Sequence, residues 1–172
     1  MKPIRIYFEG DKGLRPGFRK FFGENQRLTL VSGGNRSETE KDFLLAEKSH
    51  PECWNLLLID SDAPLIDEAR HPQRYFMVQV MESWFLGDRE ALAKYFGREF
   101  SANALRGSPM TIESIPKADV LRDLDDATRK CPKQKYSDAK VVHGRELLGS
   151  IDRDKVRRAS PECNRLFQAL SL

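Results

Sequence analysis

Hydrophobic and polar positions follow two different periods in the first part of the chain. Residues 4–8 alternate and are rich in β-branched and aromatic side chains, which predicts a β-strand. A helix is predicted next, because Leu14, Phe18 and Phe21 recur at spacings of four and three residues. A second strand is predicted over residues 28–31, and the turn-forming residues 32–35 end it.

A second helix and two further strands are predicted after this turn. Ser37 and Glu40 have the spacing of a capping box, with Ser37 at the N-cap. Residues 54–59 form an almost unbroken apolar run, as a strand buried on both faces requires. A fourth strand is predicted over 75–81. Because parallel neighbours need crossover connections, this order predicts an α/β fold with about four mainly parallel strands flanked by helices.

The second half of the chain has a mainly helical pattern. Apolar residues recur at helical spacing over 84–96, 120–124 and 147–148. Ser160 followed by Pro161 is typical of a helix start with proline at the first helical position. Residues 97–115 show weak periodicity and are predicted to form a loop or a mobile lid.

Length and composition favour one folded domain. The chain has 172 residues, 40% of them hydrophobic and 32% charged, as in typical globular proteins. We expect one domain over 1–172, with a strand-rich core over 1–86 and a mainly helical extension over 87–172 packed on it. No apolar run approaches the ~20 residues that cross a membrane, and no signal-peptide pattern begins the chain. A cytoplasmic location without a membrane partner is therefore the expectation.

Acidic residues stand at the ends of three predicted strands. Glu9 and Asp11 follow the first strand, Asp60 and Asp62 the third, and Glu82 the fourth. Ligands bind at the carboxyl ends of the strands in open α/β sheets. In extended backbone Asp60 and Asp62 point to the same side, about 6–7 Å apart. Oxygen ligands without cysteine or histidine favour a hard cation, Mg²⁺ or Mn²⁺.

Structural roles are the alternative for each of these acids. Asp62 has the right place to cap a short helix over 63–66, and Glu9 could be a solvated strand end before a glycine turn. Because clustered titratable groups in a cleft mark functional sites, acids at three strand ends favour a common site over separate structural roles.

Basic residues offer contacts for phosphate groups. The candidates are Lys12, Arg15, Arg36, Lys135, Lys140 and Arg145. Between residues 129 and 158, ten cations stand against four acids. This segment fits a nucleic-acid backbone, with Tyr136 as a stacking platform, and equally a solvated helix face with pairs such as Asp154–Arg158. His143 is more typical of a core or capping residue than of a catalyst.

Four segments resemble one small bacterial family. They are residues 6–10 (IYFEG), 57–62 (LLIDSD), 78–86 (VQVMESWFL) and 143–148 (HGRELL). The resemblance spans the chain from Ile4 to about Leu170, and the family is catalogued as domain of unknown function 4276. A glutamate that ends the first strand and an Asp-x-Asp after a later strand also resemble the Toprim domain of topoisomerases, bacterial primases and overcoming-lysogenization-defect nucleases.

The resemblance implies a Toprim-like, Rossmann-type sheet with Mg²⁺ or Mn²⁺ at the acidic cluster. Glu9 would act as a metal ligand or general base, Asp60 and Asp62 as metal ligands, and Asp11 and Glu82 as additional acids. One ion, or a pair about 3.5–4 Å apart, would activate water for hydrolysis of a phosphodiester. The chain lacks the catalytic-tyrosine domain of topoisomerases and the zinc module of primases, which leaves hydrolysis as the implied activity.

The implied function is a metal-dependent nuclease of bacterial defence or DNA repair, with nucleic acid and an ATPase as partners. A non-catalytic module that binds nucleic acid or a partner protein is the main alternative. A small-nucleotide hydrolase or transferase is a third.

Overall fold

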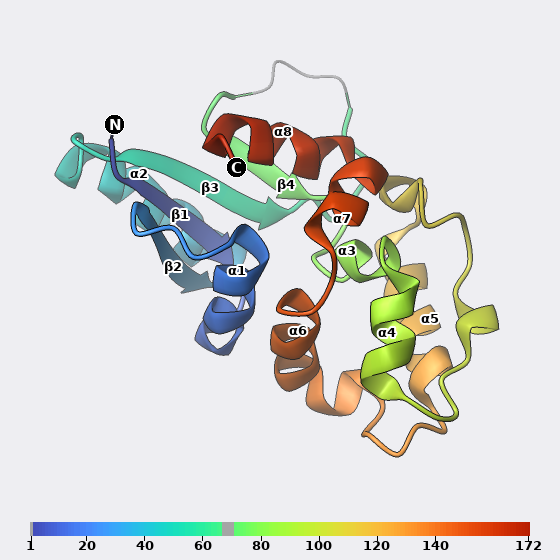
Figure 1. Ribbon diagram of the computed structural model, residues 1–172. Helices are drawn as coiled ribbons and strands as arrows, with labels where there is room; N and C mark the ends of the chain where they lie inside the picture. The colour runs from blue at the N-terminus through green and yellow to red at the C-terminus, as the bar shows by residue number, and fades with distance from the viewer. Residues whose placement is uncertain (1, 67–70) are drawn as a thin grey trace.

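A computed structural model describes residues 2–66 and 71–172 of the chain (Figure 1). Four strands form one sheet in the order β2-β1-β3-β4, and every pairing is parallel. The strands are β1 (Ile4–Glu9), β2 (Leu28–Gly34), β3 (Trp54–Asp60) and β4 (Arg74–Met77). The predicted α/β fold with a parallel, Rossmann-like sheet is therefore confirmed.

Helices flank this sheet and make up most of the second half. They are α1 (Arg15–Phe22), α2 (Arg36–Ser49), α3 (Ser83–Leu86), α4 (Arg89–Phe96), α5 (Lys117–Thr128), α6 (Lys140–Leu148), α7 (Arg153–Ala159) and α8 (Pro161–Leu170). The described residues also form four short 3-10 turns: η1 (Lys12–Leu14), η2 (Ala102–Ala104), η3 (Ile112–Ser114) and η4 (Tyr136–Ala139). Within the described ranges, no helix is long and apolar enough to cross a membrane.

Alternate strand residues pack into two separate hydrophobic layers, as the period of two along a strand dictates. On one face Phe8 and Leu58 belong to a large buried cluster that continues into α1, α3, α6 and α8. On the other face Tyr7 and Leu57 pack with Phe43 of α2. That helix contacts β1, β2 and β3. The apolar run of β3 is thus explained by burial on both faces.

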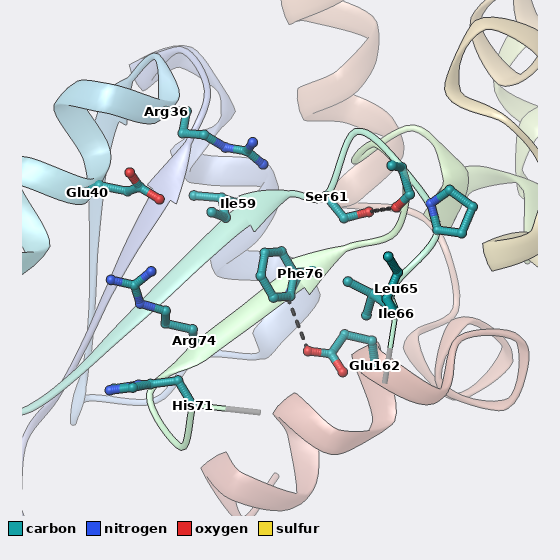
Figure 2. A pocket seen from close by; sticks show the side chains of 12 residues that line it. Arg36, Glu40, Ile59, Ser61, Leu65, Ile66, His71, Arg74, Phe76 and Glu162 are labelled. Carbon is teal, nitrogen blue, oxygen red and sulfur yellow. Dashed lines mark hydrogen bonds between the residues drawn. The ribbon is translucent and has the colours of Figure 1, made fainter. Parts of the chain in front are cut away.

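Helix α8 covers the open edge of the sheet at β4 (Figure 2). Glu162 accepts a hydrogen bond from the backbone N–H of Phe76 at 3.3 Å, and Arg165 donates to the carbonyl oxygen of Arg74. Unpaired backbone groups on an edge strand invite association with other chains. The two side chains satisfy such groups and fix α8 beside the sheet.

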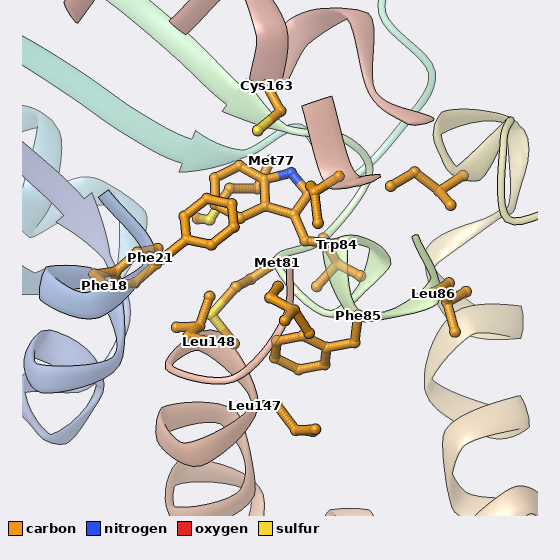
Figure 3. Close-up of a cluster of buried hydrophobic side chains, with 14 of the residues drawn as sticks. Phe18, Phe21, Met77, Met81, Trp84, Phe85, Leu86, Leu147, Leu148 and Cys163 are labelled. Atoms are coloured by element: carbon orange, nitrogen blue, oxygen red, sulfur yellow. The ribbon is translucent and has the colours of Figure 1, made fainter. Parts of the chain in front are cut away.

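Trp84 joins the sheet to the helical second half (Figure 3). The side chain is fully buried, and the Phe21 ring of α1 stacks on it with the ring centroids 4.9 Å apart. Leu147 and Leu148 of α6 are buried in the same cluster. Each large apolar side chain contributes about 1.5–3 kcal/mol when it is fully buried. This cluster therefore holds α6 against the sheet.

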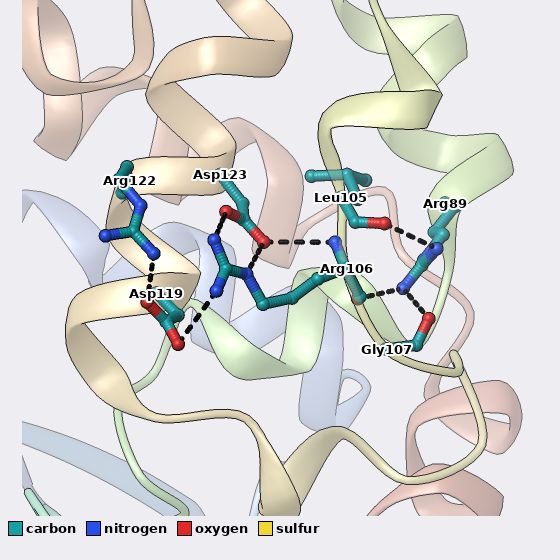
Figure 4. Close-up of polar contacts among 7 residues, drawn as sticks. All are labelled: Arg89, Leu105, Arg106, Gly107, Asp119, Arg122 and Asp123. Atoms are coloured by element: carbon teal, nitrogen blue, oxygen red, sulfur yellow. Dashed lines mark hydrogen bonds and ion pairs between the residues drawn. The ribbon is translucent and has the colours of Figure 1, made fainter.

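The segment between α4 and α5 is tied down by two arginines (Figure 4). Arg89 donates hydrogen bonds to three carbonyl oxygens in residues 105–107. The Nε atom of Arg106 lies 2.8 Å from Oδ2 of Asp123, a carboxylate of α5. The loop predicted over 97–115 is present, and these contacts anchor it to both neighbouring helices.

The junction of β2 and α2 differs from the prediction. β2 continues through Gly34, and α2 is capped by Asn35, whose Oδ1 accepts a hydrogen bond from the N–H of Glu38 at 3.0 Å. The predicted capping box with Ser37 at the N-cap is wrong. A Cβ at residue 33 would lie 2.4 Å from Thr39, so glycine there lets the helix start close against the strand.

The region around β4 also differs. β4 ends at Met77, four residues before the end of the predicted strand, and the buried residues that follow lead into α3. A short apolar run alone does not distinguish a strand from a buried connection. In the described parts of the β3–β4 connection, 61–66 and 71–73, there is no helix for Asp62 to cap.

We expect Asn35→Ala to lower the free energy of unfolding by about 0.5–2 kcal/mol, because the N-cap of α2 loses its acceptor. Ser37→Ala is the matched control and should change stability little, since Ser37 is exposed and caps nothing. Urea unfolding of both variants measures the difference. A larger loss for Ser37→Ala would contradict this capping arrangement.

Candidate functional site

A cavity of about 350 Å³ lies at the carboxyl ends of β1 and β3. Its charged lining residues are Glu9, Asp11, Asp60, Glu82, Lys117 and Lys140. Four of the five acids predicted from the strand ends therefore line one cavity. They share it with two lysines from α5 and α6, which come from the second half of the chain.

Glu9 and Asp60 are neighbours because their strands are paired in parallel. Oε2 of Glu9 accepts a hydrogen bond from the backbone N–H of Asp60 at 3.1 Å. Oδ1 of Asp60 accepts one from the N–H of Met81 at 2.8 Å. Each of the two carboxylates thus has one oxygen hydrogen-bonded to a backbone N–H group, and this bond fixes the position of the side chain.

Glu82 is a buried member of the site. It is 1% exposed and precedes α3. Its Oε1 accepts a hydrogen bond from the Tyr136 hydroxyl at 2.9 Å and lies 3.0 Å from Nζ of Lys140. Burial, together with the negative charge of Glu82, raises the pKa of Tyr136 well above its usual value. The tyrosine therefore stays a hydrogen-bond donor.

The three carboxylates of Glu9, Asp60 and Glu82 repel one another. Burial, and then the charges of Glu82 and Glu9, raise the pKa of Asp60 to about 8. An opposite charge near Asp60 would favour its ionised form again. Lys117 acts in that direction but does not outweigh the burial and the two acids. The cavity is therefore a place where added positive charge is stabilising.

Asp62 does not line this cavity. Its backbone has φ of 60°, so the expectation that extended backbone carries Asp60 and Asp62 to the same side is wrong. The carboxylate forms ion pairs with Lys117 and with Arg36, whose Nη1 lies 3.4 Å from Oδ2. Asp11 does line the cavity, and its Oδ1 accepts a hydrogen bond from the N–H of Gly13 at 2.6 Å as the N-cap of η1.

The predicted phosphate-binding residues are spread over the molecule. Arg36 lies at the site, where it donates to the carbonyl oxygen of Asp60, and Lys140 lines the cavity. Lys135 pairs with Asp125 at 3.0 Å, and Arg145 pairs with Glu146 at 3.0 Å. Lys12 and Arg15 are exposed on η1 and at the start of α1.

The basic segment 129–158 has several of its cations in ion pairs. Asp154 pairs with Arg157 at 3.5 Å, one residue from the predicted partner. Lys155 pairs with Asp88 at 2.9 Å. Tyr136 is buried, so its interpretation as a stacking platform for a base is wrong.

His143 has a core role, as its sequence context favoured. Its Nδ1 lies 2.9 Å from the Tyr95 hydroxyl and its Nε2 lies 3.0 Å from the carbonyl oxygen of Gln134. Because the carbonyl can only accept, Nε2 carries the proton and Nδ1 accepts from the tyrosine. Burial lowers the pKa of His143.

Lys117 is the site residue that sequence reasoning missed. It begins α5, and its ammonium group donates to Asp62, a residue 55 positions earlier in the chain. Burial opposes its charge, but the hydrogen bond to Asp62 and the negative charges of Asp62, Asp60 and Glu9 raise the pKa of Lys117. No local motif marks this lysine, since only the fold brings α5 to the ends of the strands.

The donor chemistry of the cavity fits a hard cation, because all its acidic groups offer oxygen ligands. Among the residues described, no three His, Cys, Asp or Glu side chains are placed to hold a metal ion together. Glu82 and Asp62 have lysine partners instead, and Nε of Arg36 lies 3.9 Å from Oε2 of Glu9. A divalent ion could be held by Glu9 and Asp60, with Glu82 joining only when its ion pair with Lys140 opens.

Comparison with known proteins identifies a family. The family model described as Domain of unknown function (DUF4276) matches residues 11–171. No curated protein and no solved structure gives a significant match to the chain.

The raised pKa of Asp60 predicts a pH dependence of stability. The folded chain holds a proton on Asp60 up to about pH 8, whereas the unfolded chain releases it near pH 4. Because the folded state binds more protons between these values, the free energy of unfolding should fall as pH rises from 4 to 8. Asp60→Asn keeps the acceptor for Met81 and removes the titration.

The measurement is urea unfolding at pH 5, 7 and 8.5 in metal-free buffer. We expect a smaller decline with pH for Asp60→Asn than for the unmodified chain. Asp42→Asn, which changes an exposed acid of α2, should keep the unmodified pH dependence. Equal declines with pH for the unmodified chain and Asp60→Asn would contradict the assignment.

Proposed function

We propose that this chain, which belongs to the family Domain of unknown function (DUF4276), is a Mg²⁺- or Mn²⁺-dependent enzyme that cleaves phosphodiesters of nucleic acid. The single observation that carries the proposal is the crowding of Glu9, Asp60 and Glu82 around one cavity beside two lysines. Carboxylates next to cations are the components of metal-assisted phosphoryl chemistry.

Glu9 and Asp60 are the residues that would hold the ion, with Glu82 as a third acid. A bound divalent ion would activate water and shield the charge that develops on the phosphoryl oxygens. Glu82 is already oriented by the Tyr136 hydroxyl. Asp11 is exposed at the cavity, and its side chain already accepts the capping hydrogen bond of η1. We therefore assign it a minor role in holding the ion.

The lysines and Arg36 are the groups that would bind the phosphate. Lys140 neutralises Glu82, and Lys117 neutralises Asp62. If the charge of the carboxylates were balanced by a bound divalent ion, the Lys140 ammonium would be available for an anionic substrate. Substrate phosphate and metal would therefore favour each other's binding.

The narrower assignment to Toprim-type chemistry rests on Glu9 and the Asp60-Ser61-Asp62 segment. Of the Asp-x-Asp pair, we assign only Asp60 to the metal, because Asp62 has two cationic partners. A role in bacterial defence or DNA repair, a cytoplasmic location and an ATPase partner belong to the same proposal.

A non-catalytic module is the second candidate function. The ion pairs of Glu82 and Asp62 with lysines favour it, because they balance the acidic charge without a metal ion. In this case the cavity would be part of a surface for nucleic acid or a partner protein.

Cleavage tests the first candidate directly. We expect cleavage of DNA or RNA that depends on Mg²⁺ or Mn²⁺. The cleavage rate should fall at least about 100-fold in Asp60→Asn and in Glu9→Gln, which is more than the loss of a residue that only contacts a metal ligand costs. Single- and double-stranded substrates are assayed with the chain alone and with any ATPase that is encoded beside it. Asp42→Asn serves as the matched control. Undiminished cleavage in Asp60→Asn would refute these residue roles.

Thermal unfolding in the presence of metal separates the two candidates. An ion that binds only the folded chain adds about 2.7 kcal/mol of stability at 100 times its dissociation constant. We expect millimolar Mn²⁺ to raise the melting temperature of the unmodified chain and of Asp42→Asn, but not that of Glu9→Gln. No response of the unmodified chain to Mg²⁺ or Mn²⁺ would favour the non-catalytic module.

A further inference from the structure

A second cavity, of about 500 Å³, lies on the α2 face of the sheet over β3 and β4 (Figure 2). This volume lies within the roughly 300–1,000 Å³ of ordinary ligand sites. Ile59 and Phe76 face it from the two strands, and Pro64 and Leu65 line it from the β3–β4 connection. We call it the β4 groove.

The β4 groove exists because one helix covers this face of the sheet incompletely. A helix is about 10 Å wide and strands lie about 4.8 Å apart, so one helix is too narrow to cover four strands. α2 packs on β1, β2 and β3. Arg74 and Phe76, which alternate along β4 with the buried Tyr75 and Met77, therefore line a hollow instead of packing under a helix.

Arginines stand at both ends of the β4 groove. Arg36 lies at the carboxyl end of the strands, and His71 and Arg74 lie at the amino end of β4. Among the described residues, the guanidinium of Arg74 has no hydrogen-bond or ion-pair partner. Two acids, Glu40 and Glu162, also line the groove, but Glu162 is bonded to Arg165 and to the N–H of Phe76.

Arg36 connects the β4 groove with the acidic cavity. While it lines the groove, its guanidinium also donates to the carbonyl oxygen of Asp60 and pairs with Asp62. A chain of phosphodiesters that has one phosphate at the acidic cavity can therefore continue past Arg36 into the groove. Beyond Arg36 the groove is lined by Phe76 and by Arg74, whose guanidinium has no partner within 2–66 and 71–172.

We propose that the β4 groove binds the nucleotide next to the cleaved phosphate of a single-stranded nucleic acid, an inference that rests on the proposed function. The base packs on Phe76 and Ile59, as bases pack on aromatic side chains in single-strand binding proteins. Arg74 binds the following phosphate, for which a guanidinium is well suited. Arg36 binds the connecting backbone between the two cavities.

Oligonucleotide binding tests the groove without any need for cleavage. The probe is a fluorescein-labelled single strand of ten nucleotides, as DNA and as RNA, measured by fluorescence anisotropy in EDTA. We expect Arg74→Gln and Phe76→Leu each to weaken binding at least about fivefold, whereas Arg98→Gln, at an exposed arginine after α4, should bind like the unmodified chain. Circular dichroism and the melting temperature verify that each variant is folded.

A second assay separates this inference from the proposed function. Bis(4-nitrophenyl) phosphate has the reacting phosphodiester but no neighbouring nucleotide. With metal present, we expect Arg74→Gln to raise KM for the oligonucleotide at least about fivefold and to leave cleavage of the small ester unchanged. Loss of the ester cleavage in Arg74→Gln would overturn the inference by placing Arg74 at the reacting phosphate.

Two further outcomes distinguish failure of the nucleotide site from failure of the proposed function. If the unmodified chain neither binds nor cleaves the oligonucleotides, or if Arg74→Gln and Phe76→Leu match it in binding and in KM, the β4 groove is not a nucleotide site. If the unmodified chain cleaves nothing but binds oligonucleotides in a manner that depends on Arg74, the proposed function fails and the nucleotide site stands.

Discussion

Repulsion among three carboxylates at one edge of the sheet is the constraint on which the site depends. Parallel pairing of β1 with β3 places Glu9 beside Asp60, and the turn into α3 adds the buried Glu82. Such a group of acids is costly in a partly buried cavity unless cations or protons compensate it. The raised pKa of Asp60 shows that the compensation by the chain itself is incomplete.

The helical second half takes part in this compensation. Lys117 at the start of α5 and Lys140 at the start of α6 reach the carboxyl ends of the strands. Their helices are held in place by packing around Trp84 and by the Arg106–Asp123 ion pair. The mainly helical second half of the chain thus supplies two of the positive charges of the site, Lys117 and Lys140.

Arg36 connects the acidic cavity with the β4 groove. It stands at the start of α2, between the acidic cavity on one side and the β4 groove on the other. The groove follows from the geometry of one helix on a four-stranded sheet, and the position of Arg36 follows from the early helix start that Asn35 and the glycines of β2 permit. A local capping arrangement therefore links the two cavities.

The sequence by itself determined the elements that depend on local patterns. The strand-forming runs, the parallel α/β class, the proline start of α8 and the acids at the strand ends could all be recognised, because strand and helix periods and capping residues act over a few positions. Only the tertiary structure decided which acids meet. Asp62 turns away through a left-handed backbone conformation and Lys117 arrives from a distant helix, because side-chain direction and long-range contacts depend on the packing of the whole chain.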